Sequence, residues 1–370
     1  MRWLRRIGVA LLVAIALLLA FGRPIAWTEA ALVVFDVASG GAPGSPYQGL
    51  TDEPVVLAAS WVGGEGDLYR PAGRVRGAMV LVPGAAALGR DEPRLQELAR
   101  TIARSGFAVL VPDLPEVRRF SLSRFDAERV AGALRHLRQE QPGKPLGVMA
   151  ISYGVAPALI AAIKDDLAPD MAFAFGVGGY RDTDAAIRFV TTGAFRVAGD
   201  SREFRVEPNR YGRWAFVLAN AGRLQNANDA TLLDIIARRR WSDPTAGVAD
   251  VEPLLSPEGK AVLALVDNRD PDRVTGLIQA LPAAIRGEID GLNLALYDLG
   301  KLRGHLILVH GQNDPLVPYS ESQALATAAV NARASLFVIG DIGHVEFNAV
   351  SLANGYKMWL AALALLDERK

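Results

Sequence analysis

Short continuous apolar runs alternate with amphipathic segments of helical period along most of the chain. The runs that we expect to form strands are residues 55–61, 67–70, 78–82, 108–112, 146–150, 171–176, 306–309 and 336–339. The amphipathic segments between the later runs include residues 94–104, 125–139, 155–164 and 322–329. Apolar strands that alternate with helices of this length are typical of an α/β fold, a mostly parallel sheet with helices on both faces. Because no helix separates the first runs, we expect the sheet to begin with antiparallel pairing.

The stretch from residue 180 to residue 303 interrupts this alternation, because it has helical character and no convincing strand. A structureless loop of that length is implausible inside a compact domain, so we expect an inserted helical cap. Caps above the strand ends often form substrate pockets, and a separate helical domain with no role in a site is the alternative. The predicted core then has two parts, residues 52–179 and residues 304–370.

An uncharged apolar segment, residues 7–21, lies near the N-terminus between arginines. A signal-peptide core contains about 7–15 apolar residues and a membrane-spanning helix about 20, so the length favours a signal peptide. Trp3 and Trp27 flank the segment as interfacial anchors do, which favours a membrane anchor. The best cleavage pattern, Ala20-Phe21-Gly22, is also poor. We therefore expect residues 1–27 to be either a signal peptide or a membrane anchor.

Three arginines precede the apolar segment, at Arg2, Arg5 and Arg6, and they should hold the N-terminus in the cytoplasm. Both alternatives then export the body, either anchored by residues 4–22 or periplasmic or secreted after cleavage. The following residues, 28–51, include a stretch rich in Gly, Pro and Ser, and we expect them to be a linker.

Composition narrows the chemistry that the chain can perform. Lys and Arg number 40, as do Asp and Glu, and 51% of the residues are hydrophobic. Zero formal charge gives no basic surface for nucleic acid, and the hydrophobic fraction is too high for a disordered chain. The sequence has no cysteine, which excludes disulfides, thiolate metal sites and a cysteine nucleophile. Any nucleophile must therefore be an oxygen or an amine.

Ser152 lies where a predicted apolar strand ends and a predicted helix begins. The segment Ala150-Ile-Ser-Tyr-Gly154 matches the nucleophile-elbow pattern Gly-x-Ser-x-Gly, with alanine in place of the first glycine. That pattern needs small residues on both sides of the serine because the strand-to-helix turn is tight. Ser152 is therefore a candidate nucleophile, and an ordinary helix cap is the alternative interpretation.

Two further polar residues follow later strands. Asp314 comes after the strand at 306–309, and His344 comes after the strand at 336–339. Both should lie at the carboxyl edge of the sheet, where Ser152 also lies. The chain order of serine, aspartate and histidine is the order that α/β-hydrolases use. Asp341 and Glu346 are alternative candidates for the acid.

On these residues the sequence resembles the α/β-hydrolase superfamily over about residues 52–366, excluding the cap. The segment Gly311-x-x-Asp314-x-x-Val317-Pro318 is similar to the acid-bearing loop of that family. The resemblance implies an α/β-hydrolase fold in which Ser152 is the nucleophile, His344 the general base and then acid, and Asp314 the residue that orients the imidazole. It implies no metal and no organic cofactor.

The resemblance also implies an oxyanion hole formed by the backbone N–H groups of Ala85 and Tyr153. Family members often have His-Gly in the loop before the first donor, where this chain has Pro83-Gly84. Because backbone groups provide the hydrogen bonds, this change should not abolish the oxyanion hole.

Other candidate residues carry weaker signals. We expect His310 to pack or to support the site and His136 to lie on the surface, whereas His305 precedes a strand and has no partner in the sequence. The basic run from Arg238 to Arg240 is interpreted as a solvated helix end, with contact to an anionic substrate as the alternative.

The leading hypothesis is an exported or membrane-anchored serine hydrolase, similar to a carboxylesterase, acting on a small-molecule or lipid-like acyl substrate. Peptidase, lipase, thioesterase and acyltransferase activities stay open, because the fold and triad do not determine the acyl group. A membrane-tethered binding module without catalysis is the alternative from another class. We expect no nucleic-acid partner, and membrane contact through the N-terminal segment if it is uncleaved.

Overall fold

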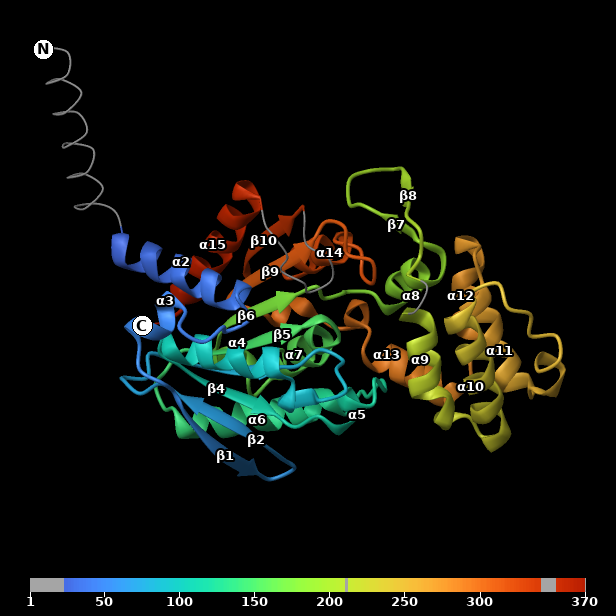
Figure 1. Ribbon diagram of the computed structural model, residues 1–370, viewed down its shortest axis with the longest axis horizontal. Coiled ribbons are helices and arrows are strands. Elements are labelled where there is room, and N and C mark those ends of the chain that lie inside the picture. The colour runs from blue at the N-terminus through green and yellow to red at the C-terminus, as the bar shows by residue number, and fades with distance from the viewer. Residues whose placement is uncertain (1–22, 210–211, 341–350, 370) are drawn as a thin grey trace, which may run out of the picture.

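A central sheet organises the computed structural model, which describes residues 23–209, 212–340 and 351–369 (Figure 1). Its eight strands run in the order β1-β2-β4-β3-β5-β6-β9-β10. Their bounds are β1 (Val55–Trp61), β2 (Gly64–Arg70), β3 (Gly77–Val82), β4 (Phe107–Pro112), β5 (Leu146–Ile151), β6 (Met171–Val177), β9 (His305–Gly311) and β10 (Arg333–Ile339). β2 pairs antiparallel with β1 and β4, and the other neighbours are parallel. The expected mostly parallel sheet with an antiparallel start is confirmed.

Helices cover both faces of the sheet because the side chains of each strand alternate between two cores. Val80 and Val148 face the core shared with α6 (Asp126–Glu140), α7 (Val155–Ala162) and α14 (Ser320–Ala328). Met79 and Met149 face the opposite core, shared with α4 (Pro93–Arg104) and α15 (Leu352–Leu366). A short helix, α5 (Pro115–Arg118), follows β4. The sheet is therefore buried on both sides, as its continuous apolar strands predict.

Residues 180–303 contribute no strand to the described part of the main sheet and form a separate layer beside it (Figure 1). Their helices are α8 (Thr183–Thr192), α9 (Gly212–Asn220), α10 (Ala227–Ser242), α11 (Pro257–Asp267), α12 (Val274–Gln279) and α13 (Ala283–Gly291). They enclose a core of their own around Trp214, Leu233 and Ile236. A short antiparallel pair, β7 (Ala194–Arg196) with β8 (Glu203–Arg205), also lies here, where we expected no strand. Strands of three residues are too short to show a period-two pattern.

Residues 28–51, which we expected to be a linker, instead contribute to two helices, α2 (Pro24–Ala38) and α3 (Pro46–Leu50). Ala30, Val33 and Tyr47 are buried against Leu366 of α15. The glycines that suggested a linker form the turn between the helices, where Gly40, Gly41 and Gly44 have positive φ. The folded body therefore includes α2 and α3 and does not start near residue 52.

Of the predicted leader, residues 1–27, residues 1–22 lie outside the described residues, and residues 24–27 form the start of α2. Within the ranges that the structure describes, every helix is too short or too polar to cross a bilayer.

Asp36 connects α2 to the rest of the body. Its carboxylate is 1% exposed and accepts hydrogen bonds from the Ser45 and Thr101 hydroxyls and from Gln48 Nε2, the last at 3.2 Å. Ser45 caps α3 and Thr101 lies on α4, so one buried carboxylate joins three helices. A buried carboxylate needs such donors to offset its desolvation.

Replacing Asp36 by Ala should lower the free energy of unfolding by about 2–4 kcal/mol, because three donors lose a charged acceptor in a buried site. Urea denaturation followed by circular dichroism measures this change. Asp52→Ala, at an exposed position close to α3, is the matched control and should change stability little. Equal stability of the two variants would contradict a structural role for α2.

Candidate active site

Ser152 occupies the tight turn that joins β5 to α7. Its φ is +50°, in the left-handed region, and of the described residues other than glycine only Phe120, at +56°, shares a positive φ. Such a conformation costs on the order of 1–3 kcal/mol and clusters at functional sites. The strand before the turn pairs with β3 up to Ala150 and with β6 up to Ile151, so the sheet holds the serine in this strained position. This geometry is that of a nucleophile elbow.

Two glycines allow the loop after β3 to approach this turn closely. A Cβ atom on Gly154 would lie 2.5 Å from the carbonyl oxygen of Pro83, and one on Gly84 would lie 3.2 Å from the carbonyl oxygen of Ile151. Gly84 is thereby placed beside Ser152, since the same added atom would lie 3.5 Å from Ser152 Cβ. The two predicted oxyanion donors, the N–H groups of Ala85 and Tyr153, belong to the two segments that meet here, and both residues line one cavity with Ser152.

The side chain of Tyr153 holds the turn in place through two hydrogen bonds. Its Oη accepts a hydrogen bond from the backbone N–H of Ser123 at 2.9 Å and donates one to Asp126 Oδ2 at 3.0 Å. Burial raises the pKa of the Asp126 carboxyl to about 6, against the hydrogen bonds from Tyr153 and Arg129, which lower it. Burial likewise raises the pKa of Tyr153, so the phenol stays protonated as a donor. The sequence does not single out Asp126, because nothing in its helical pattern shows that it faces inward.

Asp314 lies in the loop after β9 and is held in one orientation. Its Oδ1 accepts hydrogen bonds from the backbone N–H groups of Leu316, at 2.8 Å, and Val317, at 3.0 Å. Its Oδ2 lies 3.4 Å from His310 Nε2, and both side chains are buried. His310 also donates to the Val317 carbonyl oxygen at 3.0 Å, and its Nδ1 lies 2.7 Å from Ser322 Oγ. His310 thus supports the loop that carries Asp314.

The predicted general base, His344, and the alternative acids, Asp341 and Glu346, lie outside the described residues. Their predicted roles stay predictions. β9 and β10 are neighbours in parallel register, with Gly311 opposite Ile339, so the loop bearing Asp314 and the chain after β10 leave the same edge of the sheet.

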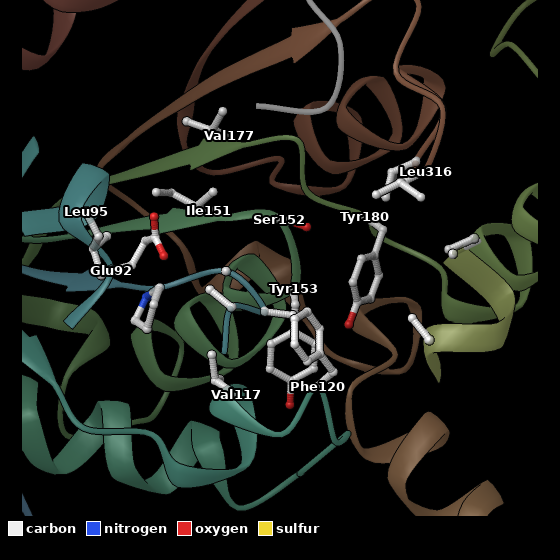
Figure 2. A pocket seen from close by; sticks show the side chains of 18 of the residues that line it. Glu92, Leu95, Val117, Phe120, Ile151, Ser152, Tyr153, Val177, Tyr180 and Leu316 are labelled. Carbon is white, nitrogen blue, oxygen red and sulfur yellow. The ribbon is translucent and has the colours of Figure 1, made fainter. Parts of the chain in front are cut away.

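A cavity of about 1040 Å³ opens beside Ser152, and Figure 2 shows Ser152, Tyr180 and Leu316 among its lining. The lining is mostly aliphatic and aromatic. Cap residues such as Val262 and Ile285 contribute one part of it, and residues of α2, α4 and α15 contribute another. Its size is at the upper end of the range for pockets that hold small molecules, about 300–1,000 Å³.

The remaining histidines and the basic run of the cap contact neighbouring side chains of the fold. His136 stacks on Trp61 with ring centroids 5.4 Å apart. His305 lies between Glu368, at 2.8 Å, and Ser335, at 2.9 Å, partners that its sequence context did not show. The arginines of the basic run each pair with a carboxylate, namely Arg238 with Asp234, Arg239 with Asp250 and Arg240 with Asp267. Within the described ranges, no group of three or more His, Asp and Glu side chains could hold a metal ion.

The strand order, the helices on both faces and the serine elbow define an α/β-hydrolase fold, as the sequence resemblance implied. No protein-family model and no curated protein matches the chain. Similar solved structures include an acylaminoacyl peptidase from Pyrococcus horikoshii, with 12% identity, a TM-score of 0.48 and coverage of 86% of this chain. This chain spans 41% of the length of that peptidase.

Two solved esterases are similar over most of their own length. One, from Pyrococcus furiosus, has 12% identity and a TM-score of 0.46, and the match covers 85% of this chain and 91% of the esterase. The other, an esterase from the bacterial hormone-sensitive lipase family, has 16% identity and a TM-score of 0.47, with coverage of 92% and 98%.

The raised pKa of Asp126 predicts how stability depends on pH. The folded protein holds this proton more tightly than the unfolded chain, whose ordinary value is 3.8. The contribution of this group to stability is therefore fully present below that value and is lost as the pH rises through about 6, a change on the order of 2–3 kcal/mol.

The Asp126→Asn variant should lose this part of the pH dependence while Asn still accepts a hydrogen bond from Tyr153. Chemical denaturation at several pH values between 4 and 7 measures the effect. Asp170→Asn, at a half-exposed carboxylate on the surface, is the control and should keep the wild-type profile. If the free energy of unfolding changed with pH in the same way for wild type and Asp126→Asn, Asp126 would not be the group responsible for this pH dependence.

Proposed function

We propose that this protein is a serine hydrolase that cleaves an ester, with Ser152 as the nucleophile, His344 as the general base and Asp314 as the orienting carboxylate. The observation that carries the proposal is the left-handed φ of Ser152 at a strand-to-helix turn in the wall of an apolar cavity. An ordinary helix cap does not require that strained conformation, whereas a nucleophile exposed at the top of a sheet does.

The proposed reaction has two steps. Ser152 Oγ attacks the ester carbonyl carbon while His344 accepts the hydroxyl proton, and the N–H groups of Ala85 and Tyr153 bind the oxyanion. The bond from carbon to the alcohol oxygen then breaks, and His344 returns the proton to the departing alcohol. Water deprotonated by His344 cleaves the acyl-enzyme in the same way, which releases the acid and restores Ser152.

The lining of the cavity supports an acyl substrate with a substantial apolar part. Small and lipid-like esters both fit this description, and their hydrophobic portions would leave water on binding. The anchored turn supports the same reaction, because the hydrogen bonds of the Tyr153 side chain fix the backbone whose N–H would bind the oxyanion.

Ser152→Ala should abolish labelling by a fluorophosphonate probe and lower kcat for short-chain ester hydrolysis by about 10⁴-fold or more, because no other group can form the acyl-enzyme. Ser60→Ala, at an exposed position on β1, is the control and should label like wild type. Unchanged labelling of Ser152→Ala would refute the assignment. A screen of purified protein across acyl chain lengths, amides and thioesters separates esterase from peptidase and thioesterase activity.

We also propose that the body is exported, either anchored by residues 4–22 or released after cleavage. Arg23, which follows the proposed anchor, forms an ion pair with Asp367 at 2.6 Å, so the described chain contacts the body from this residue onward. Mass spectrometry of protein recovered from membrane and extracytoplasmic fractions should find an N-terminus close to Arg23, or an intact chain in the membrane. An intact chain in the cytosolic fraction would contradict export.

A further inference from the structure

Arg213 is a buried charge inside the cap. It follows Gly212 at the start of α9, lines the same cavity as Ser152, and is 7% exposed. Among the described residues, its Nε and Nη1 atoms have no hydrogen-bond partner, and no carboxylate forms an ion pair with it. A buried guanidinium without partners is unfavourable by several kcal/mol, so its presence in a cavity wall needs an explanation.

The charges around Arg213 do not neutralise it. Arg240 and Arg269 lie close enough to lower its pKa, and Asp267 and Glu207 act in the opposite direction. Asp267 already lies 3.4 Å from Arg240, and Glu207 is exposed. Burial is the largest influence and, with Arg269, lowers the pKa of Arg213 to about 10, so the group stays charged at neutral pH.

The side chain is also held in place. Its Cζ lies 5.9 Å from the ring centroid of Trp214, which is 1% exposed in the core of the cap. A planar guanidinium carries N–H donors along its edges, which suits recognition of carboxylate or phosphate oxygens.

The start of α9 lies next to the loop that carries Asp314. A Cβ atom on Gly212 would lie 2.9 Å from Leu316 Cδ2, and the backbone N–H of Leu316 donates to Asp314. Arg213 and Ser152 are therefore reached from one cavity, whose remaining lining is mainly apolar.

We propose that Arg213 binds an anionic group, a carboxylate or a phosphate, at the end of a substrate whose ester bond lies at Ser152. The substrate class is then an ester with an apolar body and one anionic end. The position of the ester bond rests on the proposed hydrolase function; the anion site itself does not. The ligand anion supplies the counter-charge that no described residue provides through an ion pair with Arg213.

The first test compares two series of aryl esters of straight-chain acids, one ending in a methyl group and one in a carboxylate. Wild type should favour the carboxylate series at one chain length. Arg213→Gln should lower kcat/KM for that ester by about 10- to 100-fold, mainly through KM, and change the methyl series by less than about twofold. Arg238→Gln, which removes an exposed cap arginine, should leave both series unchanged.

The second test does not require catalysis. Isothermal titration calorimetry measures binding of decanoate and of decyl phosphate to Ser152→Ala and to the double variant Ser152→Ala/Arg213→Gln. At least one anion should bind the single variant and lose about tenfold or more in affinity in the double variant. Decanol, the neutral analogue, should bind both variants equally.

The outcomes separate the two proposals. If no ester is cleaved but anion binding depends on Arg213, the anion site stands and the hydrolase function fails. The anion site is wrong if neither anion binds Ser152→Ala, if both variants bind equally, or if Arg213→Gln lowers the methyl and carboxylate series alike.

Discussion

The turn between β5 and α7 is the constraint on which the rest of the site depends. Ser152 has a left-handed φ at the end of a strand that is paired on both sides, and glycines at positions 84 and 154 leave room for the loop after β3. A side chain at Gly154 would meet the backbone of Pro83 and push the two segments apart. The predicted oxyanion donors lie on these two segments. The close approach of the segments therefore determines the positions of both the serine and these donors.

The conformational strain at this turn costs little compared with the stabilisation that the buried side chains around it provide. β5 is the middle of the parallel sheet, and its side chains pack into both hydrophobic cores. Tyr153 adds a polar anchor in the same place, through Ser123 and Asp126. Local strain of a few kcal/mol persists where the surroundings determine the conformation this strongly.

The sequence predicted the structure best where a feature depends on neighbouring residues in the chain. The continuous apolar runs predicted the strands, because a sheet buried on both faces needs them. Ser152 was identifiable as a candidate because small neighbours flank it, and Asp314 was identifiable as a candidate because it follows a strand. Arg213 and Asp126 carry no such signal, since their burial depends on packing between segments far apart in the chain. Residues 28–51 were misjudged for a related reason: a glycine-rich turn between two helices has the composition of a linker.

The two ends of the described chain hold one another. Glu29 on α2 forms a two-pronged ion pair with Arg369, at 2.6 and 2.7 Å, and Trp359 on α15 donates a hydrogen bond to the Trp27 carbonyl oxygen. The docking site of α2 is therefore complete only once residues 352–369 have been synthesised. During translation α2 can finish packing only after α15 has formed, which delays completion of the described fold.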